Sequence, residues 1–504
     1  MRSNTTAFDG VNMNDPVVMY PLTNINFDVM EEVEMETAGH PASVGYTDGA
    51  YINIVTRSGG NKFSGGATIY FYYTNNDLSQ SLWTDEQVNA FGVSQPEMDK
   101  IWIDGSFTFG GPILTDKLWF FSNARYIKQE QSVSYVPWTD ILGRFHDKYD
   151  WSNTEMMGFI KLTSQLTKKI KLVGMFNYVD RYRPMYESPD PRTNFIATRV
   201  LDHEKAYTGN SILSCILNQN TFFDLRVGYV RRWFPLPMQE EAQGLPYITD
   251  VADNYDRLTT APYNETYIRK RFQSGLYFTR FQDNLFGGSH EFKGGLEFED
   301  AYGDWDVWRE DNLFWRWSGS PYYFGGNMGL VGFVTCGPEE GSSKMINRGR
   351  RIGTYIQDSV TFADKLTLNI GIRFDRSWTW FPALTKAASG NALSVWLGEN
   401  IVRPYVASTY PEEFPDGLNP WAEAATDEWK SAVVWNTFSP RFGLTFDLFG
   451  DGKTALKASF ARYPEYLMLS YFTMLHPLYP RWFWFMWIDT DLNEQVDQTD
   501  SFRR

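Results

Sequence analysis

Hydrophobic and polar residues alternate along many stretches of this chain, which is the pattern of β-strands with two different faces. Residues 365–375 give the clearest case. One face of this stretch carries only apolar side chains, those of Leu366, Leu368, Ile370, Ile372 and Phe374. The other face carries small, polar and charged residues, which are Thr367, Asn369, Gly371, Arg373 and Asp375. A charged face opposite an apolar one fits a wall between lipid and water better than a dry core.

Residues 101–128 contain two such strands in succession. Gly110, Gly111 and Pro112 are expected to end the first strand, and residues 115–117 supply a polar turn. Aromatic residues crowd the start of the second strand, where a bilayer interface would lie. The same unit recurs along the chain. The pattern predicts about 13 strands, at residues 63–74, 100–110, 117–132, 155–166, 170–183, 204–217, 221–235, 266–281, 290–306, 350–362, 365–379, 436–449 and 453–464.

Short and long connections alternate between these strands. The short turns are expected at residues 111–116, 167–169, 218–220, 282–289, 363–364 and 450–452. The long connections are residues 75–99, 133–154, 184–203, 236–265, 307–349 and 380–435. Connections in compact domains have a median of about 4–6 residues, whereas outer-membrane barrels place short turns on one rim and long loops on the other. The sequence therefore predicts an all-β fold, a transmembrane antiparallel β-barrel over residues 61–504 with long extracellular loops.

The first 60 residues follow a different pattern. Residues 29–39 form a short amphipathic piece, and a strand is expected at residues 51–57. A piece of this size is too small to bury a core by itself. We therefore expect residues 1–60 to pack inside the strand wall.

Composition supports a membrane barrel and argues against several other classes of protein. Aromatic residues make up 17% of a chain that is polar on average, as aromatic girdles around a polar lumen require. No run of about 18 apolar residues is present, which argues against a helical membrane span. The net charge of −15 argues against a broad nucleic-acid-binding face. No catalytic motif stands out, so no enzyme activity is expected, and Cys215 and Cys336 are expected to be unpaired.

A loop rich in aromatic residues is the first candidate binding site. Exposed rings bind sugars, peptides or apolar ligands through stacking and area burial. The alternative is that these rings pack the loop onto itself or onto the N-terminal segment. The candidate residues are Phe314, Trp315, Trp317, Tyr322, Tyr323 and Phe324.

The acidic C-terminal stretch is a candidate calcium site. It places oxygen-bearing side chains at positions 1, 3, 5, 7, 9 and 12 of a loop, as an EF-hand does, in Asp489, Asp491, Asn493, Gln495, Asp497 and Asp500. Glu494 stands where that loop requires glycine, and the loop ends in Asp instead of the bidentate Glu. The alternative is a solvated acidic loop. Apart from this possible structural Ca²⁺, no cofactor is expected.

Residues 45–66, GYTDGAYINIVTRSGGNKFSGG, resemble the end of the plug domain of TonB-dependent outer-membrane transporters, and in particular the Oar-like subfamily. The matching plug residues are Gly45, Gly49, Asn53, Thr56, Ser58 and Gly59, and Asn61, Phe63 and Gly65 match the entry into the first barrel strand. Residues 8–16 match an Asp-Gly-Val segment of the plug. Three further stretches resemble barrel hairpins of the subfamily, at residues 110–121, 355–375 and 438–463.

The resemblance implies that residues 1–60 are the C-terminal part of a plug domain and that the rest is about 13 of the 22 strands of the family's barrel. It also implies energy-coupled uptake of an unidentified extracellular ligand across the outer membrane of a Gram-negative-type bacterium. The implied partners are outer-membrane lipid, the extracellular ligand and, in the full-length protein, TonB, with no nucleic acid. The alternatives are a passive outer-membrane pore and a surface adhesion or export barrel.

Several features of the family are not found in this sequence. A signal peptide, a TonB box, the first part of the plug and a terminal aromatic strand are missing, so we expect an internal fragment. Strands near 63–74 and 453–464 would run parallel if they met. We therefore expect an incomplete wall that stays open.

Overall fold

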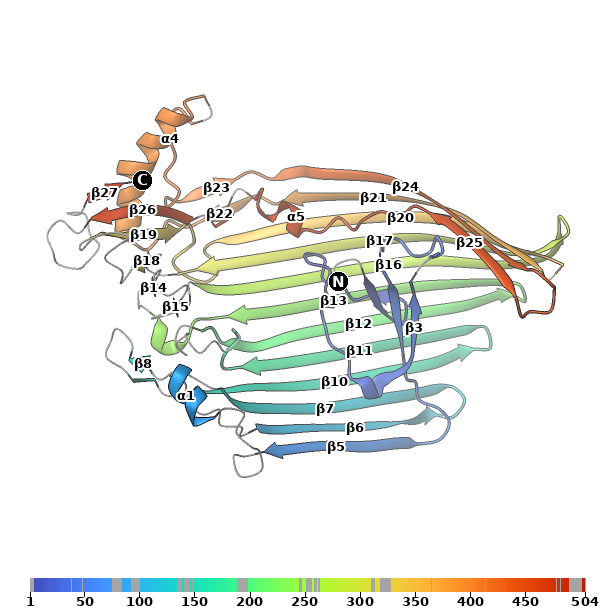
Figure 1. Ribbon diagram of the computed structural model, residues 1–504. Helices are drawn as coiled ribbons and strands as arrows, with labels where there is room; N and C mark the ends of the chain where they lie inside the picture. Colours follow the sequence, from blue (N-terminus) through green and yellow to red (C-terminus); the bar gives the residue numbers. More distant parts are fainter. Residues whose placement is uncertain are drawn as a thin grey trace.

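One antiparallel sheet of 13 strands forms the main body of the molecule in this computed structural model (Figure 1). Its strands run side by side in chain order, with the short turns at one end and the long connections at the other (Figure 1). The structure describes residues 4–37, 39–47, 49–74, 84–91, 100–133, 138–139, 145–146, 149–187, 198–243, 247–250, 256–257, 261, 263–309, 313–317, 328–363, 365–412, 414–476, 478–480, 482–488 and 501–503.

Each of the 13 predicted strands is present in this sheet. Most of the strands extend further than the apolar alternation indicated, because ladder pairing continues past the apolar part of each strand. The strands are β5 (Ser64–Thr74), β6 (Lys100–Leu114), β7 (Leu118–Val133), β10 (Tyr149–Thr167), β11 (Ile170–Arg183), β12 (Leu201–Asn218), β13 (Thr221–Leu236), β16 (Asn264–Leu285), β17 (Gly288–Trp308), β20 (Lys344–Phe362), β21 (Leu366–Phe381), β24 (Trp429–Asp447) and β25 (Ala455–Ala461).

The two edges of the sheet do not meet. Within the described residues, β5 pairs only with β6 and β25 pairs only with β24. The wall is therefore open, as the sequence predicted, and Figure 1 shows it as a curved sheet.

The expectation that Gly110, Gly111 and Pro112 end a strand is wrong. All three lie within β6, and Pro112 pairs with Trp119 next to a register shift. Proline is tolerated in a sheet at such an irregularity because no ladder N–H is needed there. The turn itself is only residues 115–117.

A second, smaller sheet is formed by four strands near the N-terminus. These are β1 (Thr5–Phe8), β2 (Val11–Asn12), β3 (Met30–Glu36) and β4 (Tyr51–Thr56), in the order β2-β1-β4-β3. The amphipathic piece expected at residues 29–39 is the edge strand β3, because it pairs antiparallel with β4. We call residues 4–56 the inner domain.

The inner domain lies against one face of the wall, which we call the inner face. Its apolar side chains form a shared core with residues from β7, β10, β11 and β13. The members of this core are Phe8, Val11, Met13, Leu22, Val29 and Ile54 of the inner domain and Phe121, Phe159, Met175 and Val230 of the wall. A domain of this size cannot bury enough apolar surface alone, and the wall supplies the missing half.

The long connections carry structure of their own near one end of the wall (Figure 1). A six-stranded sheet joins β15 (Asp256–Arg257), β14 (Tyr247–Asp250), β18 (Leu313–Trp317), β19 (Met328–Val334), β26 (Trp482–Ile488) and β27 (Ser501–Arg503). The other elements there are α1 (Asp85–Phe91), β8 (Trp138–Thr139), β9 (Phe145–His146), β22 (Leu384–Lys386), α3 (Ala392–Leu397), a π-helical turn (Gly398–Val402), α4 (Arg403–Thr409) and β23 (Ala424–Thr426). No helix among the described residues has the length and apolar character needed to cross a membrane.

After β25 the chain leaves the sheet and crosses the inner face. We call residues 462–480 the inner segment; it contains the one-turn helix α5 (Ser470–Thr473). Its backbone donates hydrogen bonds to the inner domain, from Leu469 N to Pro16 O (3.0 Å) and from Ser470 N to Val17 O (3.3 Å). The inner domain is therefore held between the wall and a later part of the chain.

The two faces of β21 have the predicted character. On β21, Ile370 and Ile372 are 52% and 47% exposed on the outer face. Arg373, between Ile372 and Phe374, is fully buried on the inner face and donates from Nη1 to the carbonyl of Ala42 (3.2 Å). The assignment of Ile370 and Ile372 to the outer face and of Arg373 to the inner face is confirmed.

A matched pair of substitutions on β21 tests this assignment in the membrane. Ile370→Arg places a charge on the outer face in the middle of the apolar stretch of β21, where it costs about 2–4 kcal/mol. Asn369→Arg places the same charge on the inner face. We expect membrane fractionation to recover much less protein for Ile370→Arg than for Asn369→Arg, and equal recovery would contradict the assignment.

Candidate functional site

The interface between the inner domain and the wall has an apolar half and a polar half. The apolar half is the shared core over β7, β10, β11 and β13. The polar half lies over β16, β17, β20, β21 and β24, where ion pairs and hydrogen bonds replace apolar packing. Such a cluster of buried charged and polar groups is where a functional site is expected.

Glu299 is the centre of the polar half. Its carboxylate accepts hydrogen bonds from Tyr46 Oη of the inner domain (2.9 Å) and from Tyr466 Oη of the inner segment (2.6 Å). It also forms an ion pair with Arg271 Nε of the adjacent strand (3.3 Å). The arginine side chain is fully buried and its guanidinium lies over the Tyr466 ring. One carboxylate therefore joins the wall, the inner domain and the inner segment.

The two tyrosines remain hydrogen-bond donors at ordinary pH. Burial raises the pKa of Tyr46 and of Tyr466 far above the usual value for a phenol. A protonated hydroxyl can donate to the carboxylate of Glu299, whereas a phenolate would repel it. The two hydroxyls donate to a charged acceptor, and such charge-assisted hydrogen bonds are stronger than neutral ones.

A second group of charges adjoins the first. Arg351 pairs with Glu297 (3.2 Å) and with Asp375 (2.8 Å), and Arg373 pairs with Asp375 (2.7 Å). Gly45 of the inner domain lies directly over this group, since a Cβ there would stand 2.8 Å from Arg373 Nη2. A larger residue here would have to displace the guanidinium groups of Arg373 and Arg351.

A third contact fixes the start of the inner domain. Lys161 Nζ reaches across from β10 to Asp9 Oδ2 (3.1 Å), Thr56 O (2.8 Å) and Thr56 Oγ1 (2.9 Å). Asp9 and Gly10 both adopt positive φ, of 49° and 77°, in the tight turn between β1 and β2. The motif residue Thr56 thus helps to satisfy a buried lysine.

The other plug-motif residues hold the inner domain and its link to the wall. Asn53 accepts a hydrogen bond from Gly10 N (2.8 Å), and the carbonyl of Gly49 lies 3.1 Å from His40 Nε2. Gly59 passes so close to the wall that a Cβ would stand 2.1 Å from Phe120 O. Ser58 is exposed.

Asn61 secures the entry into β5. Its Oδ1 accepts from Asp116 N (3.0 Å) and from Trp119 Nε1 (2.7 Å) in the first hairpin. The residue that the resemblance singled out here therefore fixes the chain at the point where it enters the wall.

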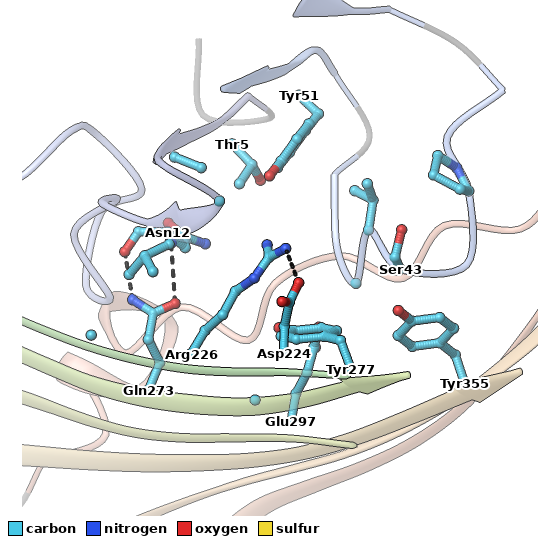
Figure 2. A pocket seen from close by; sticks show the side chains of 18 of the residues that line it. Thr5, Asn12, Ser43, Tyr51, Asp224, Arg226, Gln273, Tyr277, Glu297 and Tyr355 are labelled. Carbon is cyan, nitrogen blue, oxygen red and sulfur yellow. Dashed lines mark hydrogen bonds and ion pairs between the residues drawn. The ribbon is translucent and has the colours of Figure 1, made fainter. Parts of the chain in front are cut away.

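A cavity of about 300 Å³ lies between the inner domain and the wall (Figure 2). Its lining is mixed: Arg226 and Asp224 of β13 form an ion pair at 3.3 Å, and Glu297 and Tyr277 face them from the next strands (Figure 2). Burial raises the pKa of Tyr51, which faces the cavity from β4, to about 12, so this group is also neutral. The cavity can hold water or a small polar solute, with both donors and acceptors available.

The inner domain and the wall also bond across this cavity. Asn12 N donates to Gln273 Oε1 (3.1 Å), and Gln273 Nε2 donates to Asn12 O (2.6 Å), as Figure 2 shows. Both hydrogen bonds involve the uncharged side chain of Gln273. Water can replace them at small cost, since a neutral hydrogen bond contributes only about 0.5–1.5 kcal/mol net to stability.

The three candidate aromatic residues that the structure describes belong to a strand away from this site. Phe314, Trp315 and Trp317 lie in β18, which pairs with β14 and β19 among the long connections. Tyr322, Tyr323 and Phe324 lie outside the described residues. Ligand binding by these rings remains a prediction.

The candidate calcium ligands Asp489, Asp491, Asn493, Gln495, Asp497 and Asp500 all lie outside the described residues. In the part of the chain that the structure describes, no group of three or more His, Cys, Asp or Glu side chains is placed to hold a metal ion. Neither Cys215 nor Cys336 forms a disulfide bond within the described residues.

Sequence reasoning missed the residues that surround Glu299. Arg271, Glu299 and Arg351 occupy inner-face positions of three neighbouring strands, and charge at such positions was a signal available in the alternation. Tyr466 could not be found this way, because it follows the last strand and returns to the inner face only through the fold.

An open antiparallel wall with an apolar outer face and a folded domain on its inner face defines an outer-membrane β-barrel type of protein. The chain belongs to the family described as "Outer membrane beta barrel domain", which matches residues 144–482. It is a protein of the bacterial outer membrane.

The resemblance to TonB-dependent transporters is confirmed by a sequence relative. The chain is 23% identical to the TonB-dependent transporter Oar of Myxococcus xanthus, in an alignment that covers 93% of this chain and 47% of the relative. The chain thus spans about half the length of the curated relative it matches.

Solved structures show the same fold. The outer membrane transporter YddB of Escherichia coli is similar with a TM-score of 0.60 and 13% identity, over 93% of this chain and 54% of that one. The ferric citrate transporter FecA in its unliganded form has a TM-score of 0.55 and 11% identity, over 97% of this chain and 59% of that one. The ferric-catecholate import receptor Fiu of E. coli K12 has a TM-score of 0.53 and 14% identity, over 92% of this chain and 63% of that one. These relatives are named as transporters and receptors, not as enzymes.

Removing the charge of Glu299 tests the buried centre of the site. Glu299→Gln leaves Arg271 buried without a counter-charge, which we expect to destabilise the protein by about 3–5 kcal/mol. The control is Glu291→Gln on the same strand, where a half-exposed pair with Lys293 (3.0 Å) is lost at a cost of about 0–1 kcal/mol. Urea unfolding of the detergent-solubilised protein measures both, and similar midpoints for the two variants would contradict the assignment.

His476 gives the inner segment a dependence on pH. Its ring packs against Phe381, Nδ1 accepts from Leu478 N (3.1 Å), and Nε2 is buried without a hydrogen bond within the described residues. Burial lowers the pKa of His476 to about 4. The folded state therefore disfavours the protonated ring, which the unfolded chain forms below a pKa of about 6.5.

The sign of the effect follows from proton binding. Between pH 6.5 and 4 the unfolded state binds more protons, so stability is lost as pH falls through this window, by about 3 kcal/mol in all. Thermal unfolding at pH 7.5 and at pH 4.5 measures the loss. Glutamine does not titrate, so in His476→Gln the loss of stability between these two pH values should be smaller by about 3 kcal/mol. An unchanged pH dependence in this variant would show that His476 is not the source of the loss.

Proposed function

We propose that this protein is a TonB-dependent outer-membrane transporter or receptor that takes up an extracellular ligand in an energy-coupled way. In this proposal the inner domain is the C-terminal part of a plug that occupies the space behind the wall. The observation that carries the proposal is the inner domain itself, packed on the inner face through a half-polar interface. A passive pore has no use for a folded domain in that place.

The chemistry of the interface suits a part that must move. An apolar interface loses its burial when it separates, at roughly 25 cal/mol for each Å² exposed. The polar half instead offers hydrogen bonds that water can replace, such as those between Asn12 and Gln273. The cavity on this side supplies room into which the interface can open.

The relatives support the same function at the level of their class. The sequence relative is named as a TonB-dependent transporter, and the solved structures include a transporter of ferric citrate and an import receptor for ferric catecholates. The identity of the ligand taken up by this chain does not follow from them. Mass spectrometry of small molecules that co-purify with the protein would identify it.

A disulfide across the interface tests whether the inner domain must move. In a background without Cys215 and Cys336, Val11→Cys combined with Gly228→Cys joins the inner domain to β13. A Cβ on Gly228 would stand 3.5 Å from that of Val11, within the disulfide range of about 3.5–4.5 Å. The control disulfide joins two wall strands, through Asn369→Cys and Gly443→Cys, with a Cβ separation of 3.4 Å.

The readout is independent of the ligand. Ser43→Cys, in the cavity lining, is labelled with a membrane-impermeant maleimide in energised cells and in cells treated with a protonophore. We expect labelling to rise severalfold with energy, to lose this rise when the interface disulfide forms, and to keep it with the control disulfide. Labelling that is high without energy would indicate a passive pore, and labelling that is low throughout would indicate an adhesion or export barrel.

A further inference from the structure

The outer face of the wall carries six basic residues toward the side of the long connections. Their neighbours in sequence face inward, as the buried Glu204, Arg271 and Asp375 do. The basic residues therefore lie on the opposite face of the same strands. We call this set the cationic belt. It consists of Lys205, Arg231, Lys270, Arg348, Arg350 and Arg376.

From end to end the belt runs obliquely across the strands, although Arg231, Lys270 and Arg348 lie level with one another. Arg231 is directly opposite Lys270, and Arg350 and Arg376 lie successively closer to the short turns. From Lys205 on β12 to Arg376 on β21, the belt crosses five strand spacings, about 24 Å, and shifts by six residues, about 20 Å. The slope of about 40° equals the tilt of strands in outer-membrane barrels, about 35–45°. The belt therefore follows a line parallel to the membrane plane.

The distance to the next outward charge on β16 places this line at one edge of the apolar band. Below Lys270, the outer face of β16 presents Phe272, Leu276 and Phe278, which are about 40% exposed, before Arg280. Ten residues separate Lys270 from Arg280, which is about 33 Å along the strand and about 25 Å in height at that tilt. The lipid-facing apolar band of such barrels is about 25 Å tall.

The belt lies on the extracellular side, because long loops face outward in these barrels and short turns face the periplasm. Aromatic rings accompany it, as expected at a membrane interface. Lys270 Nζ lies 4.5 Å from the centre of the Tyr302 ring, and Arg350 lies 4.9 Å from that of Trp380. The six basic residues are therefore at the level of the headgroups of the outer leaflet.

Two of the cations form no ion pair in the described part of the chain. Arg231 and Lys270 stand opposite each other on β13 and β16, and neither forms an ion pair there. Arg231 Nε is buried and makes no hydrogen bond among the described residues. Like charges directly opposite in a sheet repel, so this pair is destabilising until an anion lies between them.

The carboxylates nearby leave the belt positive. Asp300 is shared by Arg348 (3.0 Å) and Arg350 (2.7 Å), and Asp304 accepts a hydrogen bond from Tyr302 Oη (3.3 Å). Asp180 of β11 lies directly opposite Lys205, and the six basic residues still outnumber the carboxylates Asp180, Asp300 and Asp304.

We propose that Arg231 and Lys270 bind the phosphate of an anionic lipid headgroup in the outer leaflet, with Arg348 beside them across Tyr302. A phosphate oxygen can accept from both a guanidinium and an ammonium group, and it relieves their mutual repulsion. The exposed apolar side chains directly below the belt supply the surface for the acyl chains of the same lipid. This favours a lipid over free phosphate and gives the outer face a specific partner, independently of transport.

Native mass spectrometry of the detergent-solubilised protein tests the site. The probe is a bisphosphorylated glycolipid with acyl chains, compared with the same lipid after removal of its phosphates. We expect the intact lipid to bind, and each of Arg231→Gln and Lys270→Gln to weaken it by about fivefold, the change for one basic residue near an anionic lipid surface. The phosphate-free lipid should bind no better to the protein than to these variants.

Arg280→Gln is the matched control, since it removes the same charge from the same face of the same strand at the opposite edge of the apolar band. It should leave binding within twofold of the unmodified protein. Equal losses for Lys270→Gln and Arg280→Gln, or equal binding of the phosphate-free lipid, would overturn the site. Displacement of the lipid by millimolar inorganic phosphate would show a simple anion site and would also overturn the proposal.

Discussion

The constraint on which the structure depends is that a strand in a membrane wall must pair on both sides and must present a different face to each environment. Each backbone N–H and C=O in lipid needs a partner, which the ladders of the 13-stranded sheet supply except at β5 and β25. Once the strands pair, the period of two residues assigns each side chain to lipid or to the interior. The two proposed sites both follow from this assignment.

Neighbouring residues in sequence contribute to different sites for this reason. Arg271 pairs with Glu299 on the inner face, whereas Lys270 belongs to the belt on the outer face. In the same way Arg351 contacts the carboxylates behind the wall, and Arg350 lies with Trp380 in front of it. Basic residues that look like one continuous patch in the sequence are therefore divided between an interior that holds the inner domain and an exterior that faces lipid headgroups.

The interior combines a firm attachment with one that water can replace. The shared apolar core over β7 to β13 holds the inner domain in its resting position, because separating it would expose apolar surface. The polar half over β16 to β24 is held by buried ion pairs, whose net contribution to stability is small because both charges lose hydration. Such pairs contribute more to the alignment of the parts than to their affinity, and the inner segment adds to this alignment through Tyr466.

Local alternation was enough to predict the strands, their two faces and the hairpins, because lipid and water impose the same two-residue period along the wall. The residues of β21 fell on the faces that the sequence indicated, and all 13 strands were found. Gly110 to Pro112 were misjudged because cross-strand pairing carried β6 past residues that usually end a strand.

The partners of the buried charges were decided only by the tertiary structure. Tyr46 and Glu299 are 253 residues apart, and Tyr466 and Glu299 are 167 apart, so no local pattern could join them. The slope of the cationic belt likewise exists only once the register of the strands from β12 to β21 is known. The sequence by itself determined which side of the wall each residue faces, since that depends on its nearest neighbours. The fold decided which residues meet, because contacts across the interior depend on how the whole sheet curves around the inner domain.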